Sequence, residues 1–168
     1  MLLAAPLPGS GLCQSTNVDG GRQGRKPLVL WRCGKLELEP RTVRCQAGVM
    51  PPETRAMIAA TAHAFVIGKR VAGLYDHSAG RHLRIAAESR KPYLQGYDGD
   101  RDSRFGGALP ELRDAGSGAQ VHMMVQGSTV SGYDRSSSGH FTVEVAERLV
   151  QLYDHVDGAW FAYDVQFA

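Results

Sequence analysis

Hydrophobic and polar residues alternate along most of the chain from about residue 70 onward, which is the period of a β-strand with one buried face. Leu83, Ile85 and Ala87 occupy one side of an early segment, and the segment from Phe141 to Val145 alternates in the same way. Short clusters of Gly, Ser and Asp separate such segments, as in hairpin turns. The pattern predicts an all-β fold.

An internal repeat organises the predicted strands. The dipeptide Tyr-Asp occurs four times, and each time an apolar residue follows eight positions after the Tyr. Each unit is typical of strand, loop and strand, in which the Asp accepts backbone N–H groups of an Asx-turn. The dipeptides are Tyr75-Asp76, Tyr97-Asp98, Tyr133-Asp134 and Tyr153-Asp154, and the apolar residues are Leu83, Phe105, Phe141 and Phe161.

The hairpins predict an antiparallel meander, because pairing of neighbours along the chain is the simplest topology. An extra strand, Val121 to Gln126, follows an expected loop from Pro110 to Gly118, so the count is about nine strands. Four similar hairpins can hide their sheet edges by surrounding an axis. The sequence therefore predicts a short barrel or a propeller-like disc.

The segment before the repeats has a different composition. Residues 1–56 show no sustained period and carry all of the excess basic charge, so we expect a poorly ordered basic tail followed by a repeat domain at 57–168. A chain that began at Met50 or Met57 would keep every repeat, and one hypothesis is that translation starts at one of these residues. Across the end of this segment, the residues from Glu53 to Val66 predict a short helix that Gly68 ends.

Composition excludes some classes of partner. The formal net charge is +2, from 19 basic and 17 acidic residues, which is too even to favour nucleic acid. No apolar stretch approaches the roughly 20 residues of a transmembrane helix, and no signal peptide is convincing. Cys13, Cys33 and Cys45 match no metal or redox spacing, and their odd number, with none in the repeat domain, favours the cytoplasm.

The four Tyr-Asp hairpins with Gly-containing loops resemble those of the bacterial β-flower proteins, over residues 66–168. The resemblance implies short hairpins that radiate around a shallow barrel. That architecture is similar to the C-terminal domain of tubby-like proteins, so the resemblance also implies a lipid or apolar ligand. It implies no catalytic residue.

One loop carries the spacing of a calcium site. Asp98, Asp100 and Asp102 alternate like the first ligands of a calcium-binding loop, and three neighbouring carboxylates favour a hard cation. An EF-hand needs Gly and Glu where this chain has Ser103 and Leu109. Calcium therefore stays an alternative to neutralisation by the arginines of the same loop.

The histidines of the hairpin loops are a second candidate. His77, His82, His140 and His155 lie in or beside the loops of three repeats, and convergence on one rim would allow zinc binding or acid–base chemistry. The alternative is that each covers an aromatic neighbour. The serines at 136–138 lie near His140, but no G-x-S-x-G motif accompanies them.

Aromatic residues are the third candidate. The repeated tyrosines either pack in the core between hairpins or form a stacking platform for a sugar or an apolar ligand, and Trp160 has no equivalent in the other repeats. The predicted ligand-binding residues are His77, His140, His155 and Trp160.

The predicted function is a non-enzymatic binding or interaction module whose hairpin loops contact an unidentified ligand or protein. The alternative is a small hydrolase or metal site made by His and Asp at the rim.

Overall fold

The computed structural model describes residues 48–168. Most of the expected basic tail, with its three cysteines, lies outside these residues. The described part begins with one helix, α1 (Pro52–Ile67), and continues in strands only. The strands are β1 (Val71–Asp76), β2 (Arg81–Leu83), β3 (Ile85–Arg90), β4 (Tyr93–Asp98), β5 (Ser103–Ala108), β6 (Glu111–Asp114), β7 (Gln120–Gln126), β8 (Thr129–Asp134), β9 (Gly139–Val145), β10 (Leu149–Asp154) and β11 (Ala159–Phe167).

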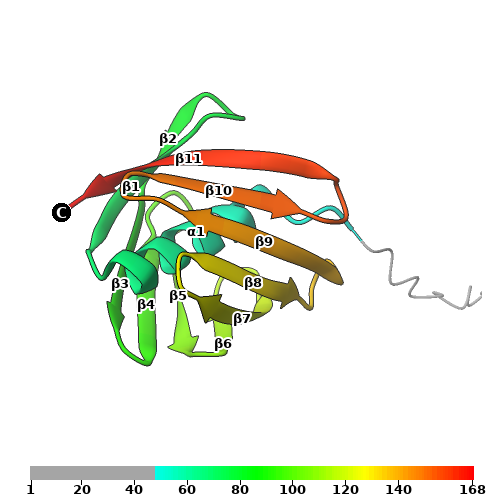
Figure 1. The fold of residues 1–168 in the computed structure, drawn as a ribbon, viewed down its shortest axis with the longest axis horizontal. Coiled ribbons are helices and arrows are strands. Elements are labelled where there is room, and N and C mark those ends of the chain that lie inside the picture. The colour runs from blue at the N-terminus through cyan, green and yellow to red at the C-terminus, as the bar shows by residue number, and fades with distance from the viewer. Residues whose placement is uncertain (1–47) are drawn as a thin grey trace, which may run out of the picture. The chain divides into compact units, whose positions relative to one another are not determined.

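The strands form one antiparallel sheet that closes into a barrel (Figure 1). From β3 to β11 each strand pairs with its neighbour in sequence, and β11 closes the ring by pairing with β1. β2 stands outside the ring because it pairs with β1 alone. The all-β antiparallel meander is thereby confirmed, and of the two expected forms the chain adopts the barrel. Closure removes the unpaired edges of the ring.

The sheet has eleven strands, where about nine were expected. The return strand of the first hairpin is divided at Arg84 into β2 and β3, so β3 can turn away and pair with β4. The expected loop from Pro110 to Gly118 also contains a strand, β6, and a fifth hairpin. The four Tyr-Asp hairpins are all present, but they are not the whole ring.

Helix α1 lies within the ring of strands (Figure 1), and every residue from 54 to 64 is buried. Pro52 is suited to the first helical turn, and Gly68 ends the helix with a left-handed conformation at φ 75°. The predicted helix is therefore confirmed. A helix that is buried on all its faces belongs to a core, so α1 fills the barrel.

The expected domain boundary between residues 56 and 57 falls inside α1. Met50 lies before the helix, yet only 1% of its surface is exposed. Its backbone N–H donates to the Asp154 carboxylate at 3.3 Å, on the last hairpin. The core thus begins at or before Met50.

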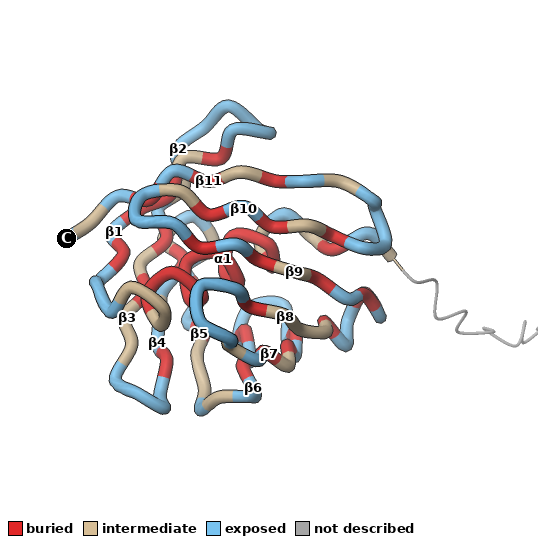
Figure 2. The backbone as a smooth tube through the Cα atoms, viewed as in Figure 1, coloured by how far each residue is buried: buried red, intermediate tan, exposed pale blue. Residues whose placement is uncertain are grey.

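Burial alternates along the strands as the sequence pattern predicts (Figure 2). Phe105, Phe141 and Phe161 are buried as expected, whereas Leu83 is half-buried because β2 is not part of the ring. Phe105 lies opposite Gly96, and Phe141 lies opposite Gly132. A Cβ atom at either glycine would overlap the ring of the facing phenylalanine. In both hairpins, therefore, the aromatic ring occupies the space that a glycine leaves.

Each Asp of the repeat makes the predicted turn. The carboxylates of Asp76, Asp98, Asp134 and Asp154 all accept backbone N–H groups from residues two and three positions later. Asp114 makes a similar turn in the fifth hairpin, where it accepts the Gly116 N–H at 3.1 Å and the Ser117 hydroxyl at 2.7 Å. All of these aspartates are buried at one end of the barrel, so their recurrence has a structural cause.

Candidate functional site

The repeated tyrosines lie on the outside of the barrel. In each hairpin the Asp points inward, so the preceding Tyr faces outward because strand residues alternate. Tyr97 is 42% exposed, and the other three are half-buried. The expectation that these tyrosines pack in the core is therefore wrong. They line the outer surface beside their cross-strand partners, which are His82, Arg104, His140 and Trp160.

A hollow of about 460 Å³ lies on the outer surface of β7, β8 and β9. We call it the histidine groove. Its floor is the strand backbone at Gly132, and three histidines from different elements surround it. The lining residues are His122, Met124, Ser131, Gly132, Tyr133, His140, Phe141, Thr142 and His155.

Aromatic contacts extend the histidine groove toward β11. The rings of Tyr133 and His140 are 4.9 Å apart between centroids. Across the next strands, Tyr153 contacts His155 at 4.9 Å and Trp160 at 5.1 Å. Trp160 is 54% exposed. The groove and Trp160 therefore form one continuous surface of outward aromatic and imidazole rings.

Among the residues that the structure describes, none that lines the histidine groove is an aspartate, glutamate, lysine or arginine. Polar groups come instead from imidazoles and from the hydroxyls of Ser131, Tyr133 and Thr142. His155 Nε2 lies 3.0 Å from Thr142 Oγ1. Rings that provide stacking faces, together with neutral hydrogen-bonding groups, suit an uncharged ligand that has both apolar faces and hydroxyls.

The structure brings only some of the predicted residues together. His140 and His155 line the same groove, and Trp160 adjoins it through Tyr153. His77 lies elsewhere, on the first hairpin, where its Nε2 is 3.0 Å from Asp164 Oδ2. His82 stacks on Tyr75 at 4.8 Å. Each histidine does cover an aromatic neighbour, as the alternative proposed.

Sequence reasoning missed His122, which faces Tyr133 directly across β7 and β8. The signal was present, because the tight turn at Gly127 fixes which residues of the two strands are opposite. Counting back from that turn pairs Gln126 with Thr129 and His122 with Tyr133. Once β7 is recognised, this count therefore identifies the residues of β7 and β8 that lie side by side on the outer face.

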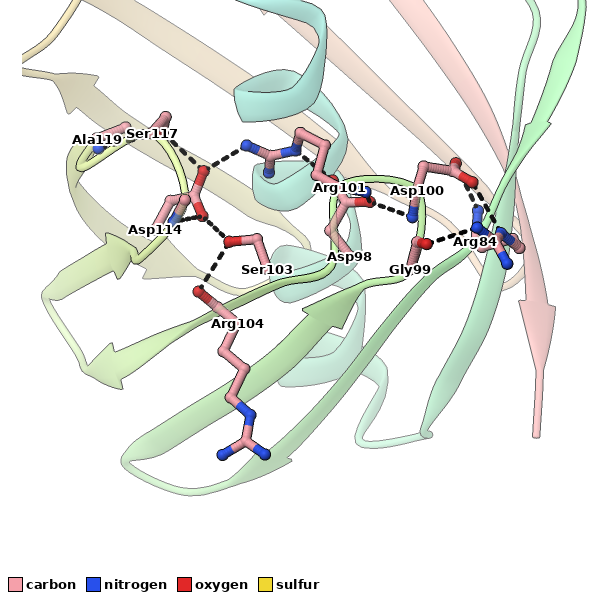
Figure 3. Close-up of polar contacts among 11 residues, drawn as sticks. Arg84, Asp98, Gly99, Asp100, Arg101, Ser103, Arg104, Asp114, Ser117 and Ala119 are labelled. Carbon is pink, nitrogen blue, oxygen red and sulfur yellow. Dashed lines mark hydrogen bonds and ion pairs between the residues drawn. The ribbon is translucent and has the colours of Figure 1, made fainter.

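The three aspartates of the calcium candidate have separate partners, which Figure 3 shows for Asp98 and Asp100. Asp98 accepts Arg101 Nε at 2.6 Å, and Asp100 accepts Arg84 Nε at 2.8 Å. Asp102 accepts the hydroxyl of Tyr97. Within residues 48–168 no group of three or more His, Cys, Asp or Glu side chains is placed to hold a metal ion. The carboxylates serve turns and ion pairs instead.

Arg101 joins two hairpins at this end of the barrel. Besides Asp98, its guanidinium donates to Asp114 Oδ2 at 2.8 Å (Figure 3). Although burial raises the pKa of Asp114, hydrogen bonds from Ser117, Arg101, the Gly116 N–H and Ser103 lower it to about 2. The carboxylate of Asp114 is fully buried and therefore depends on these donors.

The serines of the third repeat are part of its turn. Ser136 Oγ donates to Asp134 at 2.6 Å, and Ser137 Oγ donates to the same carboxylate at 2.7 Å. The remaining hydroxyl–imidazole contact is that of Thr142 with His155. Thr142 sits in a strand that is paired on both sides, so sheet hydrogen bonds engage the backbone there.

Comparison with known proteins gives no match to a family model, to a curated protein or to a solved structure. The resemblance to β-flower proteins therefore stays a prediction. Among residues 48–168, no helix combines the length and apolar character needed to cross a membrane.

Proposed function

We propose that this chain is a non-enzymatic binding module whose ligand lies in the histidine groove and extends toward Trp160. The observation that carries the proposal is the gathering of outward rings over a hollow of about 460 Å³. Exposed aromatic side chains on a rigid sheet lose little conformational freedom on binding, so they are effective contact residues. The barrel, filled by α1, supplies that rigidity.

The ligand that fits best is neutral and carries hydroxyl groups, as a carbohydrate does. A sugar ring has apolar faces that stack on aromatic rings and hydroxyls that bond to imidazole and hydroxyl groups. In the described part of the chain, the lining has no aspartate, glutamate, lysine or arginine to select a charged ligand. An apolar or lipid ligand, which the β-flower resemblance implies, would leave the polar groups of the groove unpaired.

Trp160 fluorescence provides the test. The chain has two tryptophans, and replacing Trp31 by Phe leaves Trp160 as the only one. We expect a neutral oligosaccharide, cellotriose or chitotriose, to change its emission in a saturable way. His140→Ala should weaken binding about three- to tenfold, which corresponds to the loss of one stacking contact.

His82→Ala is the matched control, because His82 also stacks outward on a repeat tyrosine but lies outside the groove. It should leave the affinity unchanged. The proposal fails if neither saccharide alters the emission, or if both histidine variants weaken binding equally. Saturable binding of dodecanol without any saccharide response would replace the sugar by an apolar ligand.

A further inference from the structure

A second hollow lies on the outer surface of β3, β4 and β5, with a volume of about 330 Å³. We call it the arginine groove. Like the histidine groove, it has strand backbone as its floor and a repeat tyrosine at its side. The lining residues are Arg70, Ala86, Ala87, Glu88, Gln95, Gly96, Tyr97, Arg104 and Phe105.

The two grooves occupy equivalent places in two hairpins. Each lies over a glycine that faces a buried phenylalanine, Gly96 with Phe105 in one and Gly132 with Phe141 in the other. The repeat tyrosine lies next to that glycine in both. The residue opposite the tyrosine differs, because Arg104 stands where the histidine groove has its cross-strand histidine. The same backbone arrangement therefore carries a permanently charged guanidinium, that of Arg104, in the arginine groove.

The charge on the arginine groove is not fully balanced. Within residues 48–168, Glu88 is the only acidic residue that lines it, and that carboxylate already pairs with Arg70 at 2.9 Å and with Arg90 at 3.5 Å. The Gln95 amide also donates to it. Among residues 48–168 Arg104 has no ion-pair partner, and its guanidinium extends away from the Asp98–Asp114 network (Figure 3).

The nearest carboxylates of the second hairpin already have partners, one of them at the edge of the arginine groove itself. Asp102 accepts the hydroxyl of Tyr97, and Asp100 pairs with Arg84 at 2.8 Å. The ring of Tyr97 is 42% exposed and faces the same surface as Arg104, its cross-strand neighbour. A free guanidinium beside an exposed ring, above a floor of Ala86 and Gly96, can hold an anion and a planar group together.

We propose that the arginine groove binds a small anionic ligand that carries a ring. Its phosphate or carboxylate group pairs with Arg104, and its ring lies against Tyr97. The site is separate from the histidine groove, so the chain presents two equivalent surfaces with different selectivity: one for a neutral ligand and one for an anion. Ligand binding at the arginine groove does not depend on the function proposed above.

The experiment uses phenyl phosphate as the probe and amide chemical shifts of the full-length chain as the readout. We expect phenyl phosphate to shift the amides of Gly96 and Arg104 without shifting that of Gly132. Arg104→Gln should weaken binding about tenfold or more, since a hydrogen bond to a charged group is worth roughly 1.5–3 kcal/mol. Raising the ionic strength should also weaken it.

Arg148→Gln is the matched control, because Arg148 is exposed and lies in the turn between β9 and β10. Amide dispersion of each variant shows that it is folded. The proposal is overturned if benzyl alcohol, the neutral probe, gives the same shifts, or if the two arginine variants bind within twofold of each other. Inorganic phosphate that binds as tightly as phenyl phosphate would overturn the role assigned to Tyr97.

Discussion

Phe141 lies directly opposite Gly132 on the neighbouring strand, and its ring covers the inner face of that glycine. A Cβ atom at Gly132 would overlap both this ring and the carbonyl oxygen of His122. The close approach explains why a residue with no side chain stands in the middle of a central strand. It also places the floor of the histidine groove against the core, so packing inside the barrel supports the outer surface.

Gly132→Ala should destabilise the protein by about 1–3 kcal/mol, the usual range for overpacking a core. The added methyl group has to displace the Phe141 ring and the β7 backbone. Chemical denaturation measures the loss. Ser131→Ala, at the next position but facing outward, is the control and should cost about 0.5 kcal/mol or less. Equal losses would mean that the ring does not fill the space beside Gly132.

Phe141→Ala should cost about 3–5 kcal/mol, because it removes a fully buried aromatic side chain and leaves a cavity. Thr142 faces outward in the same strand, so Thr142→Ala should cost about 0.5 kcal/mol or less. Urea denaturation of the two variants side by side compares them. A loss at Thr142 as large as that at Phe141 would contradict the assignment of inner and outer faces along β9.

The sequence predicted most of the barrel because the repeat marks its hairpins. It missed the fifth hairpin because Arg113 replaces the tyrosine there, although Asp114 makes the same turn and Val121 follows eight positions after Arg113. A repeat that is defined by the dipeptide Tyr-Asp does not include this hairpin. The structural requirement is the aspartate alone, since the tyrosine faces outward and the turn does not depend on it.

The position of α1 could not be predicted from local patterns. Its apolar residues surround the helix, which indicates burial, but Arg55 and His63 interrupt the pattern and suggest an exposed face. Both are buried within the barrel. The guanidinium of Arg55 lies 3.6 Å from the centre of the Phe161 ring. Only closure of the sheet between β1 and β11 creates this interior, and that is a contact between residues distant in sequence.

The sequence predicts only part of the candidate site, for a related reason. It indicates His140 and His155 because they lie near hairpin loops, and both line the histidine groove. The same reasoning placed His77 with them, yet His77 pairs with Asp164 on another part of the ring. Loop position says which end of the barrel a residue occupies, whereas only strand order says which neighbours it has there.

Truncation tests where the folded domain begins. A fragment of residues 48–168 should unfold cooperatively, because it keeps Met50 and all of α1. A fragment of residues 57–168 loses Met50, the first turn of the helix and buried Arg55, so its near-UV circular dichroism should weaken. Thermal melts of the two fragments show whether the folded domain begins before Met57. Similar sharp transitions would show that the residues before Met57 add nothing to the core.

His63 should make the protein less stable in mild acid. Burial lowers its pKa from 6.5, with the positive charge of Lys69 acting in the same direction, while a hydrogen bond to the Glu147 carbonyl opposes the shift. The unfolded chain therefore binds a proton more readily than the folded one below pH 6.5, and stability falls as the pH falls through that value.

Chemical denaturation at pH 8 and at pH 5.5 measures this loss. His63→Gln keeps a donor for the Glu147 carbonyl but cannot be protonated, so the difference between the two pH values should shrink. His82→Gln, at an exposed position, is the control and should retain the difference. If His63→Gln leaves the difference unchanged, the acid sensitivity arises from other groups.

Asp114 should contribute stability that is lost only in strong acid. Against the opposing effect of burial, donors that include Ser117 and Arg101 hold its pKa at about 2, compared with 3.8 for an unperturbed aspartate. Because the folded pKa is the lower one, the contribution is complete above about pH 4 and disappears as the pH falls through the folded value. The difference in pKa corresponds to about 2 kcal/mol at neutral pH.

Asp114→Asn removes the charge while it keeps the shape of the side chain, so it should reduce stability at pH 7 by about that amount. The variant should also lose less stability than the unmodified chain between pH 4 and pH 2, since one titrating group is gone. Glu144→Gln removes an exposed carboxylate, and it should leave the slope in this range nearly unchanged. Guanidinium denaturation at several pH values gives both slopes. If Asp114→Asn steepened the acid slope, the carboxylate would be protonated in the folded state, and the ion pair with Arg101 could not be what joins the second hairpin to the fifth one.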